Sequence, residues 1–259
     1  MPTLKLKDVQ LEYAFAGPGH APVLVFSNSL GTNLAMWDPQ MSDLSRAFRI
    51  LRHDMRGHGR SEVTLGPYTI PQLAADVFHL LDALKIDKFD FCGLSMSGMI
   101  GMELALHAPH RVRKVIVCNT APKLGTAVAW NTRIQTVQAG GMKAVADAVI
   151  ERWFTPEFRA ASPAVVESTK QMLLNTPPEG YAASCAAIRD FDATAAISSI
   201  RVPTLIIHGT RDPVTAADDG EKMAAAIPGA QLANLPVAHM SNIEAAPAFT
   251  MAVAKFLQA

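Results

Sequence analysis

The chain has 259 residues, of which 49% are hydrophobic and 18% charged, and its 23 basic and 23 acidic side chains leave no net charge. This composition is that of a compact globular protein and excludes an intrinsically disordered chain. No basic run is present, so nucleic acid is not expected as a partner.

Cysteine spacing and hydropathy exclude further classes of protein. Cys92, Cys118 and Cys185 are an odd number without a C-x-x-C pair, so neither a disulfide framework nor a zinc site is expected. No apolar stretch reaches the roughly 18 residues needed to span a bilayer. Residues 1–10 mix charged residues with leucine and lack the apolar core of a signal peptide. We therefore expect no membrane partner and a cytoplasmic location.

Short apolar runs alternate with helical patterns along most of the chain. Strands are expected at residues 11–16, 22–27, 48–51, 89–92, 115–118 and 204–207. Residues 23–26 are apolar at every position, which is typical of a parallel strand covered on both faces. Helices are expected at 70–84, 99–108 and 245–257, where apolar residues recur at helical spacing. The alternation predicts an α/β fold with a mostly parallel sheet and helices on both faces.

Residues 123–189 interrupt this alternation. Four helical patterns follow one another without a convincing strand, at residues 127–138, 142–154, 163–174 and 180–190. The block predicts a helical cap, 123–189, inserted into a core made of residues 1–122 and 190–259. The alternative is a set of ordinary crossover helices that cover no site.

Residues 91–98, Phe-Cys-Gly-Leu-Ser-Met-Ser-Gly, follow an apolar strand and precede a helical pattern. A nucleophile elbow requires this context, with small residues two positions before and after the serine. Gly93 and Ser97 are both small, so Ser95 is the predicted nucleophile. Ser97 would have bulky Met99 as its own flanking residue and is disfavoured. The competing interpretation of Ser95 is a simple helix N-cap.

Two later segments supply the partners that a nucleophilic serine needs. Asp212 follows the apolar strand at 204–207, and His239 lies in a loop before the last helix, which Ser241 or Asn242 could cap. The order serine, acid, histidine is that of the α/β-hydrolase architecture. A plain Asp-Pro turn is the alternative for Asp212. No histidine pair has metal-ligand spacing, so neither a metal nor another cofactor is expected.

These residue types fit acyl transfer. A serine hydroxyl is a weak nucleophile until a base takes its proton, and histidine, with an ordinary pKa of about 6.5, can do so. The carboxylate orients the imidazole. The oxyanion requires two donors. We expect them to be the backbone N–H groups of Met96 and of Leu30, in the loop 27–32, although that loop could also be a simple turn.

Several motifs together are similar to the 3-oxoadipate enol-lactonases of the α/β-hydrolase superfamily, over nearly the whole chain. The segments that carry the resemblance are residues 27–32, 51–59, 91–98, 118–121, 152–156, 179–182 and 238–244. The chain departs from the family pattern at three positions, with Ser97 in place of glycine, Met55 in place of threonine and Met240 in place of leucine.

The resemblance implies hydrolysis of 3-oxoadipate enol-lactone, a five-membered ring with an acetate arm, in the breakdown of aromatic compounds. The reaction passes through an acyl-enzyme. The substrate carboxylate needs a cation or donor in the pocket. Trp130 and Arg133 lie three apart and can share a helix face. We expect Trp130 to line the pocket and Arg133 or Arg189 to read the carboxylate, although either arginine could equally be solvated.

Three other functions share these residues. A general carboxylesterase or a cofactor-free perhydrolase-type haloperoxidase would use the same triad and turn over neutral aryl esters. A C–C bond hydrolase would need a longer pocket. A small-molecule binding protein could keep the fold without turnover, but it would have no need of Ser95, Asp212 and His239 together.

Overall fold

The computed structural model, described for residues 1–215 and 218–259, contains one eight-stranded sheet in the order β1-β2-β4-β3-β5-β6-β7-β8. β2 pairs antiparallel with β1 and β4, and all pairs from β4 to β8 are parallel. The strands are β1 (Thr3–Lys5), β2 (Gln10–Ala16), β3 (Val23–Ser27), β4 (Arg49–His53), β5 (Phe89–Leu94), β6 (Val112–Cys118), β7 (Thr204–Gly209) and β8 (Gln231–Leu235).

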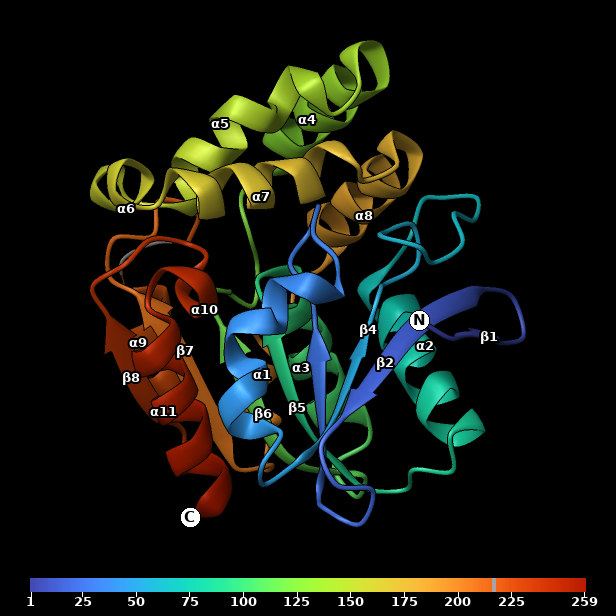
Figure 1. The fold of residues 1–259 in the computed structure, drawn as a ribbon, viewed down its shortest axis with the longest axis vertical. Coiled ribbons are helices and arrows are strands. Elements are labelled where there is room, and N and C mark those ends of the chain that lie inside the picture. Colours follow the sequence, from blue (N-terminus) through green and yellow to red (C-terminus); the bar gives the residue numbers. More distant parts are fainter. Residues whose placement is uncertain (216–217) are drawn as a thin grey trace.

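Helices cover both faces of the sheet (Figure 1). α1 packs against α11, and α2 packs against α3, which also contacts β5 and β6. All residues of β5 and β7 are buried, as expected for central parallel strands. The helices around the sheet are α1 (Asp38–Leu44), α2 (Ile70–Ala83), α3 (Met96–His107), α9 (Asp219–Ala226), α10 (Ser241–Glu244) and α11 (Ala246–Gln258), with 3-10 turns at Leu34–Trp37 and Ile197–Ser199.

Five helices lie across one end of the sheet (Figure 1). They are α4 (Ala127–Gly140), α5 (Lys143–Trp153), α6 (Pro156–Ala161), α7 (Pro163–Leu174) and α8 (Pro178–Asp190), and no strand interrupts them. The end that they cover is the carboxyl edge, where β3, β5, β6 and β7 finish. Within residues 1–215 and 218–259, no helix is both long enough and apolar enough to cross a membrane.

The predicted mostly parallel sheet with helices on both faces is confirmed, but some local predictions are wrong. α3 begins at Met96 rather than Met99 because the tight turn at Ser95 leads directly into it. The last helix is divided into α10 and α11, and neither Ser241 nor Asn242 caps it. The Ser241 hydroxyl instead donates to Asn119, and the Asn242 amide donates to the Met36 carbonyl.

Candidate active site

Ser95 occupies a strained turn between β5 and α3. Its backbone angles are φ 60° and ψ −117°, a left-handed conformation that a non-glycine residue adopts only when its surroundings impose it. Its N–H donates to the Cys118 carbonyl at 2.8 Å, and its carbonyl accepts from the Thr120 hydroxyl at 2.8 Å. A Cβ atom on Gly93 would lie 2.2 Å from the Ser97 carbonyl oxygen, so only glycine fits there.

Ser97 bridges the nucleophile turn and the loop after β3. Its fully buried hydroxyl lies 2.5 Å from the Asn28 carbonyl, to which it donates, and 2.8 Å from the Ser27 hydroxyl. The extra hydroxymethyl group, compared with the family's glycine, therefore fills a polar position. It also ties α3 to the segment that leads to Leu30.

Asp212 and His239 form a buried pair at the carboxyl edge. Asp212 Oδ2 lies 2.8 Å from His239 Nδ1, and both side chains are almost fully buried. The carboxylate also accepts from the Thr215 hydroxyl and the Val214 N–H, each at 2.8 Å. Burial alone would raise the pKa of the Asp212 carboxyl, but His239, the Asn119 side chain and the Val214 N–H outweigh it and hold the pKa below its ordinary value. The acid therefore stays ionised beside the ring.

Asn119 is a further partner of this pair that the sequence analysis did not single out. It follows β6 with φ 44°, and its Nδ2 donates to Asp212 Oδ2 at 3.0 Å and to the Ala238 carbonyl at 3.2 Å. Its Oδ1 accepts from the Ser241 hydroxyl. One side chain thus holds both the acid and the loop of His239. In the sequence, the signal for this role was the position of Asn119 directly after a predicted strand, at its carboxyl end.

The two predicted oxyanion donors are both free to act. The N–H groups of Leu30 and Met96 have no protein acceptor among the described residues. In contrast, the Gly31 N–H donates to His58 Nε2 at 3.0 Å. Burial lowers the pKa of His58 to about 4, so the ring is neutral near pH 7 and can accept this bond. The loop after β3 is therefore fixed on both sides of Leu30, by Ser97 and by His58.

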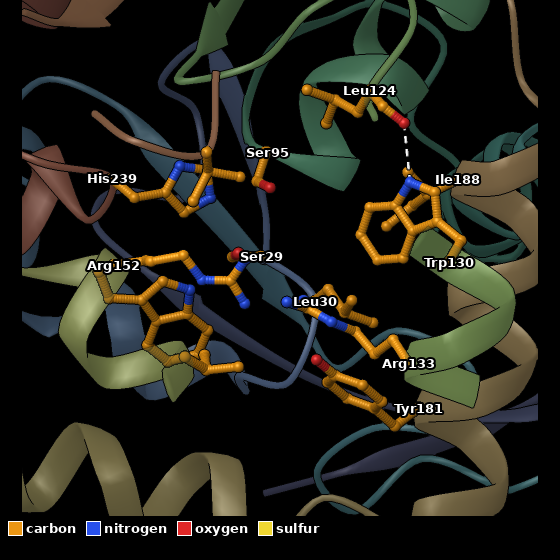
Figure 2. Close-up of a pocket in the computed structure, with 13 residues that line it drawn as sticks. Ser29, Leu30, Ser95, Leu124, Trp130, Arg133, Arg152, Tyr181, Ile188 and His239 are labelled. Atoms are coloured by element: carbon orange, nitrogen blue, oxygen red, sulfur yellow. Dashed lines mark hydrogen bonds between the residues drawn. The ribbon is translucent and has the colours of Figure 1, made fainter. Parts of the chain in front are cut away.

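Ser95 and His239 line one cavity under the helices (Figure 2). Its volume is about 30 Å³, enough for two or three water molecules, so a substrate ring enters only if side chains of the overlying helices shift. The cavity is lined by Ser29, Leu30, Ser95, Leu124, Trp130, Arg133, Val149, Arg152, Trp153, Tyr181, Ile188, Val214 and His239.

Two arginines reach into this cavity, Arg133 from α4 and Arg152 from α5 (Figure 2). Arg133 lies 5.2 Å from the centroid of the Trp130 ring, as expected for side chains on one helix face. Arg152 donates from Nε to the Ala148 carbonyl at 3.1 Å. Neither guanidinium forms an ion pair with a carboxylate among the described residues. An unpaired, partly buried guanidinium is a ready partner for an anion.

Arg189 does not line this cavity. The structure places it on another surface of α8, where it forms an ion pair with Asp190 at 2.7 Å and donates to Asn131 at 2.7 Å. Arg152 was not singled out in the sequence, although the Arg-Trp-Phe-Thr-Pro segment at 152–156 was among the family motifs.

A serine on a strand-turn-helix elbow, a buried acid–histidine pair and a mostly parallel sheet are together typical of α/β hydrolases. A family model described as the α/β hydrolase fold matches residues 22–246. The chain is 43% identical to 3-oxoadipate enol-lactonase 2 of Acinetobacter baylyi, over 97% of this chain and 94% of that protein. It is 39% identical to 3-oxoadipate enol-lactonase 1 of the same organism, over 93% and 91%.

The crystal structure of an enol-lactonase from Burkholderia xenovorans LB400 has a TM-score of 0.98 against this structure, with 44% identity and 100% of both chains covered. The chain therefore belongs to the α/β-hydrolase fold family and, within it, to the group of the 3-oxoadipate enol-lactonases. The predicted enzyme class is thereby confirmed, and the protein is a hydrolase that acts on ester bonds.

Proposed function

We propose that this enzyme opens 3-oxoadipate enol-lactone, a small lactone with a free carboxylate, in the catabolism of aromatic compounds. The proposal rests on two guanidinium groups, those of Arg133 and Arg152. Both lie in the cavity that Ser95 and His239 line, and neither forms an ion pair with a described carboxylate. A neutral ester has no use for two cations in so small a space, whereas a carboxylate arm forms charge-assisted hydrogen bonds with them. The relatives' names support the same substrate.

In this proposal the residues at the carboxyl edge carry out the chemistry. His239 takes the Ser95 proton as the Ser95 oxygen attacks the lactone carbonyl, and Asp212 stabilises the imidazolium that forms. The N–H groups of Leu30 and Met96 receive the developing oxyanion. The ring C–O bond then breaks, and the enol oxygen leaves with the proton from the imidazolium.

The second half of the reaction frees the enzyme. The released enol tautomerises to the ketone while its carbon chain stays bound through the acyl group. His239 then takes a proton from water as the water oxygen attacks the acyl carbon, and it returns that proton to the Ser95 oxygen as the acyl bond breaks. The product is a dicarboxylate. No cofactor takes part in any of these steps.

The five helices α4–α8 act, in this proposal, as a substrate-selecting cap, residues 123–189, on a core of residues 1–122 and 190–259. Arg133 and Arg152 both come from these helices, and Trp130 lines the cavity beside them, with its Nε1 donating to the Leu124 carbonyl at 2.7 Å. The three free cysteines fit a reducing compartment, which supports the cytoplasm as the location.

The test compares kcat/KM on the enol-lactone and on p-nitrophenyl acetate, a neutral ester. We expect a strong preference for the lactone in the wild type. Arg133→Ala and Arg152→Ala should each lower kcat/KM on the lactone by about tenfold to a hundredfold, the effect of one lost hydrogen bond to a charged group, while the neutral ester is little affected. Arg189→Ala is the matched control, since Arg189 lies outside the cavity, and it should change neither value.

Two results would contradict the proposal. Efficient turnover of p-nitrophenyl acetate with no preference for the lactone would favour a general carboxylesterase or perhydrolase. Equal losses on both substrates in the arginine variants would exclude carboxylate recognition by these side chains.

A further inference from the structure

Two hydrogen bonds bracket His239, one to the last residue of α5 and one to Glu244 in α10. On one side of the histidine, the Met240 N–H donates to the Trp153 carbonyl at 3.0 Å. On the other side, the Ala238 N–H donates to Glu244 Oε2 at 3.1 Å. Glu244 in turn accepts from the Thr155 N–H at 3.3 Å and from the Thr155 hydroxyl. The loop of the proposed base is thus fixed, before and after the base itself, to residues 153–155.

The same segment reaches the cavity from its other end. Arg152 and Trp153 form the last turn of α5 and both line the cavity. Arg152 is joined to its own helix by the hydrogen bond from Nε to the Ala148 carbonyl. An anion that binds and moves its guanidinium therefore also acts on the last turn of α5. Because the cavity holds only about 30 Å³, side chains that line it, such as those of Arg152 and Trp153, shift when a substrate enters. Figure 2 shows Arg152 and His239 on neighbouring walls.

We infer that Glu244 is a positioning residue that couples binding of a substrate carboxylate at Arg152 to alignment of His239. This inference rests on the proposed function, in which His239 is the base and Arg152 reads the carboxylate. His239 Nδ1 is held on Asp212, so the place of Nε2 depends on the backbone at Ala238 and Met240. A displacement of about 1 Å at a reacting group can cost a hundredfold in rate.

The coupling has a kinetic consequence. A substrate with a carboxylate engages Arg152 and fixes residues 153–155, and through Glu244 and the Trp153 carbonyl it fixes the base. A neutral ester has no carboxylate to bind Arg152, so His239 is not aligned in this way when such an ester is bound. Binding energy from the arm, remote from the reacting bond, therefore raises kcat as well as lowering KM.

The experiment measures kcat on the enol-lactone and on p-nitrophenyl acetate, together with Tm, for Glu244→Ala, Glu244→Gln and Thr155→Val. We expect Glu244→Ala to lower kcat on the lactone about tenfold or more and kcat on the neutral ester about threefold or less. Glu244→Gln keeps an acceptor oxygen and should recover part of the loss. Thr155→Val should act in the same direction as Glu244→Ala.

Two matched controls separate positioning from general loosening of the cap. Lys123→Ala removes another contact between cap and core, the exposed ion pair with Asp192 at 2.8 Å. Thr126→Val removes another helix N-cap of the cap, the bond from the Ala129 N–H to Thr126. Neither residue touches the His239 loop, so both variants should retain the wild-type ratio of the two kcat values.

The double variant Arg152→Ala/Glu244→Ala completes the test. If the two residues act in one path, Glu244→Ala changes the kcat ratio little once Arg152 is absent. Equal losses of kcat on both substrates in Glu244→Ala, or additive effects in the double variant, would overturn the inference and leave Glu244 a structural residue. If Arg152→Ala by itself leaves the substrate preference intact, the proposed carboxylate recognition fails instead, whatever Glu244 does.

Discussion

The proposed core and the proposed cap hold the groups of the candidate active site in different ways. In the core, Asp212 accepts from Asn119, Thr215 and Val214 as well as facing His239, and Ser95 is fixed in a strained turn. In the cap, Arg133 rests against the Trp130 ring and Arg152 has one bond to a carbonyl of its own helix.

This difference separates chemistry from recognition. Groups that stabilise a transition state work best when their orientation is fixed before the substrate arrives. Groups that read a substrate can adjust, because binding itself orders them. We therefore expect changes to the groups around Ser95 and Asp212 to lower turnover on every ester, and changes to the two arginines of the cap to alter the choice among esters.

The largest expected effect is at Ser95. Ser95→Ala should lower kcat on both substrates by on the order of 10⁴-fold or more, because removal of the nucleophile leaves only binding and the oxyanion donors. His239→Ala should cost about as much, and the double variant little more, since the two groups act as a unit. Steady-state kinetics and labelling by a fluorophosphonate measure this directly. Unchanged labelling of Ser95→Ala would exclude Ser95 as the nucleophile.

Asn119 should show an intermediate effect with a pH signature. Asn119→Ala removes a donor to Asp212, so kcat should fall about tenfold to a hundredfold on both substrates. Because the donor favours the ionised carboxylate, its loss raises the pKa of Asp212. The acidic limb of the pH–rate profile should therefore move to higher pH. An unshifted profile with only a lower Tm would make Asn119 a purely structural residue.

The smallest expected effect is at Ser97. Ser97→Ala leaves the Asn28 carbonyl without its donor and loosens the loop that leads to Leu30, so kcat should fall about threefold to tenfold. Ser27→Ala is the control, because the Ser97–Asn28 bond remains. Its kcat should stay close to that of the wild type. Equal losses in the two variants would show that Ser97 has no particular role in placing the loop.

The core was more predictable from sequence than the cap. Ser95, Asp212 and His239 each follow or precede a regular element, and the chain order of the three is typical of the architecture, so local patterns were sufficient to propose them. Asn119 lies at an equivalent strand end, but an asparagine after a strand is usually only a turn residue. Its role depends on β6 and β7 lying side by side, which no local pattern states.

In the proposed cap, no local pattern distinguishes the arginines that reach the cavity from those that do not. All three candidates, Arg133, Arg152 and Arg189, lie on predicted helices. Only the packing of α4, α5 and α8 decides which of them reaches the cavity. The spacing argument for Trp130 and Arg133 concerned a single helix and agrees with the structure. The contact between Glu244 and Thr155 joins residues 89 positions apart and could not be predicted from either segment.

A crystal structure of Ser95→Ala with the unhydrolysed enol-lactone would show whether the two arginines bind the substrate carboxylate. We predict that the carboxylate arm lies within hydrogen-bond distance of Arg133 and Arg152, while the ring carbonyl oxygen faces the N–H groups of Leu30 and Met96. A lactone bound with its arm toward solvent and both guanidinium groups unoccupied would exclude carboxylate recognition by Arg133 and Arg152.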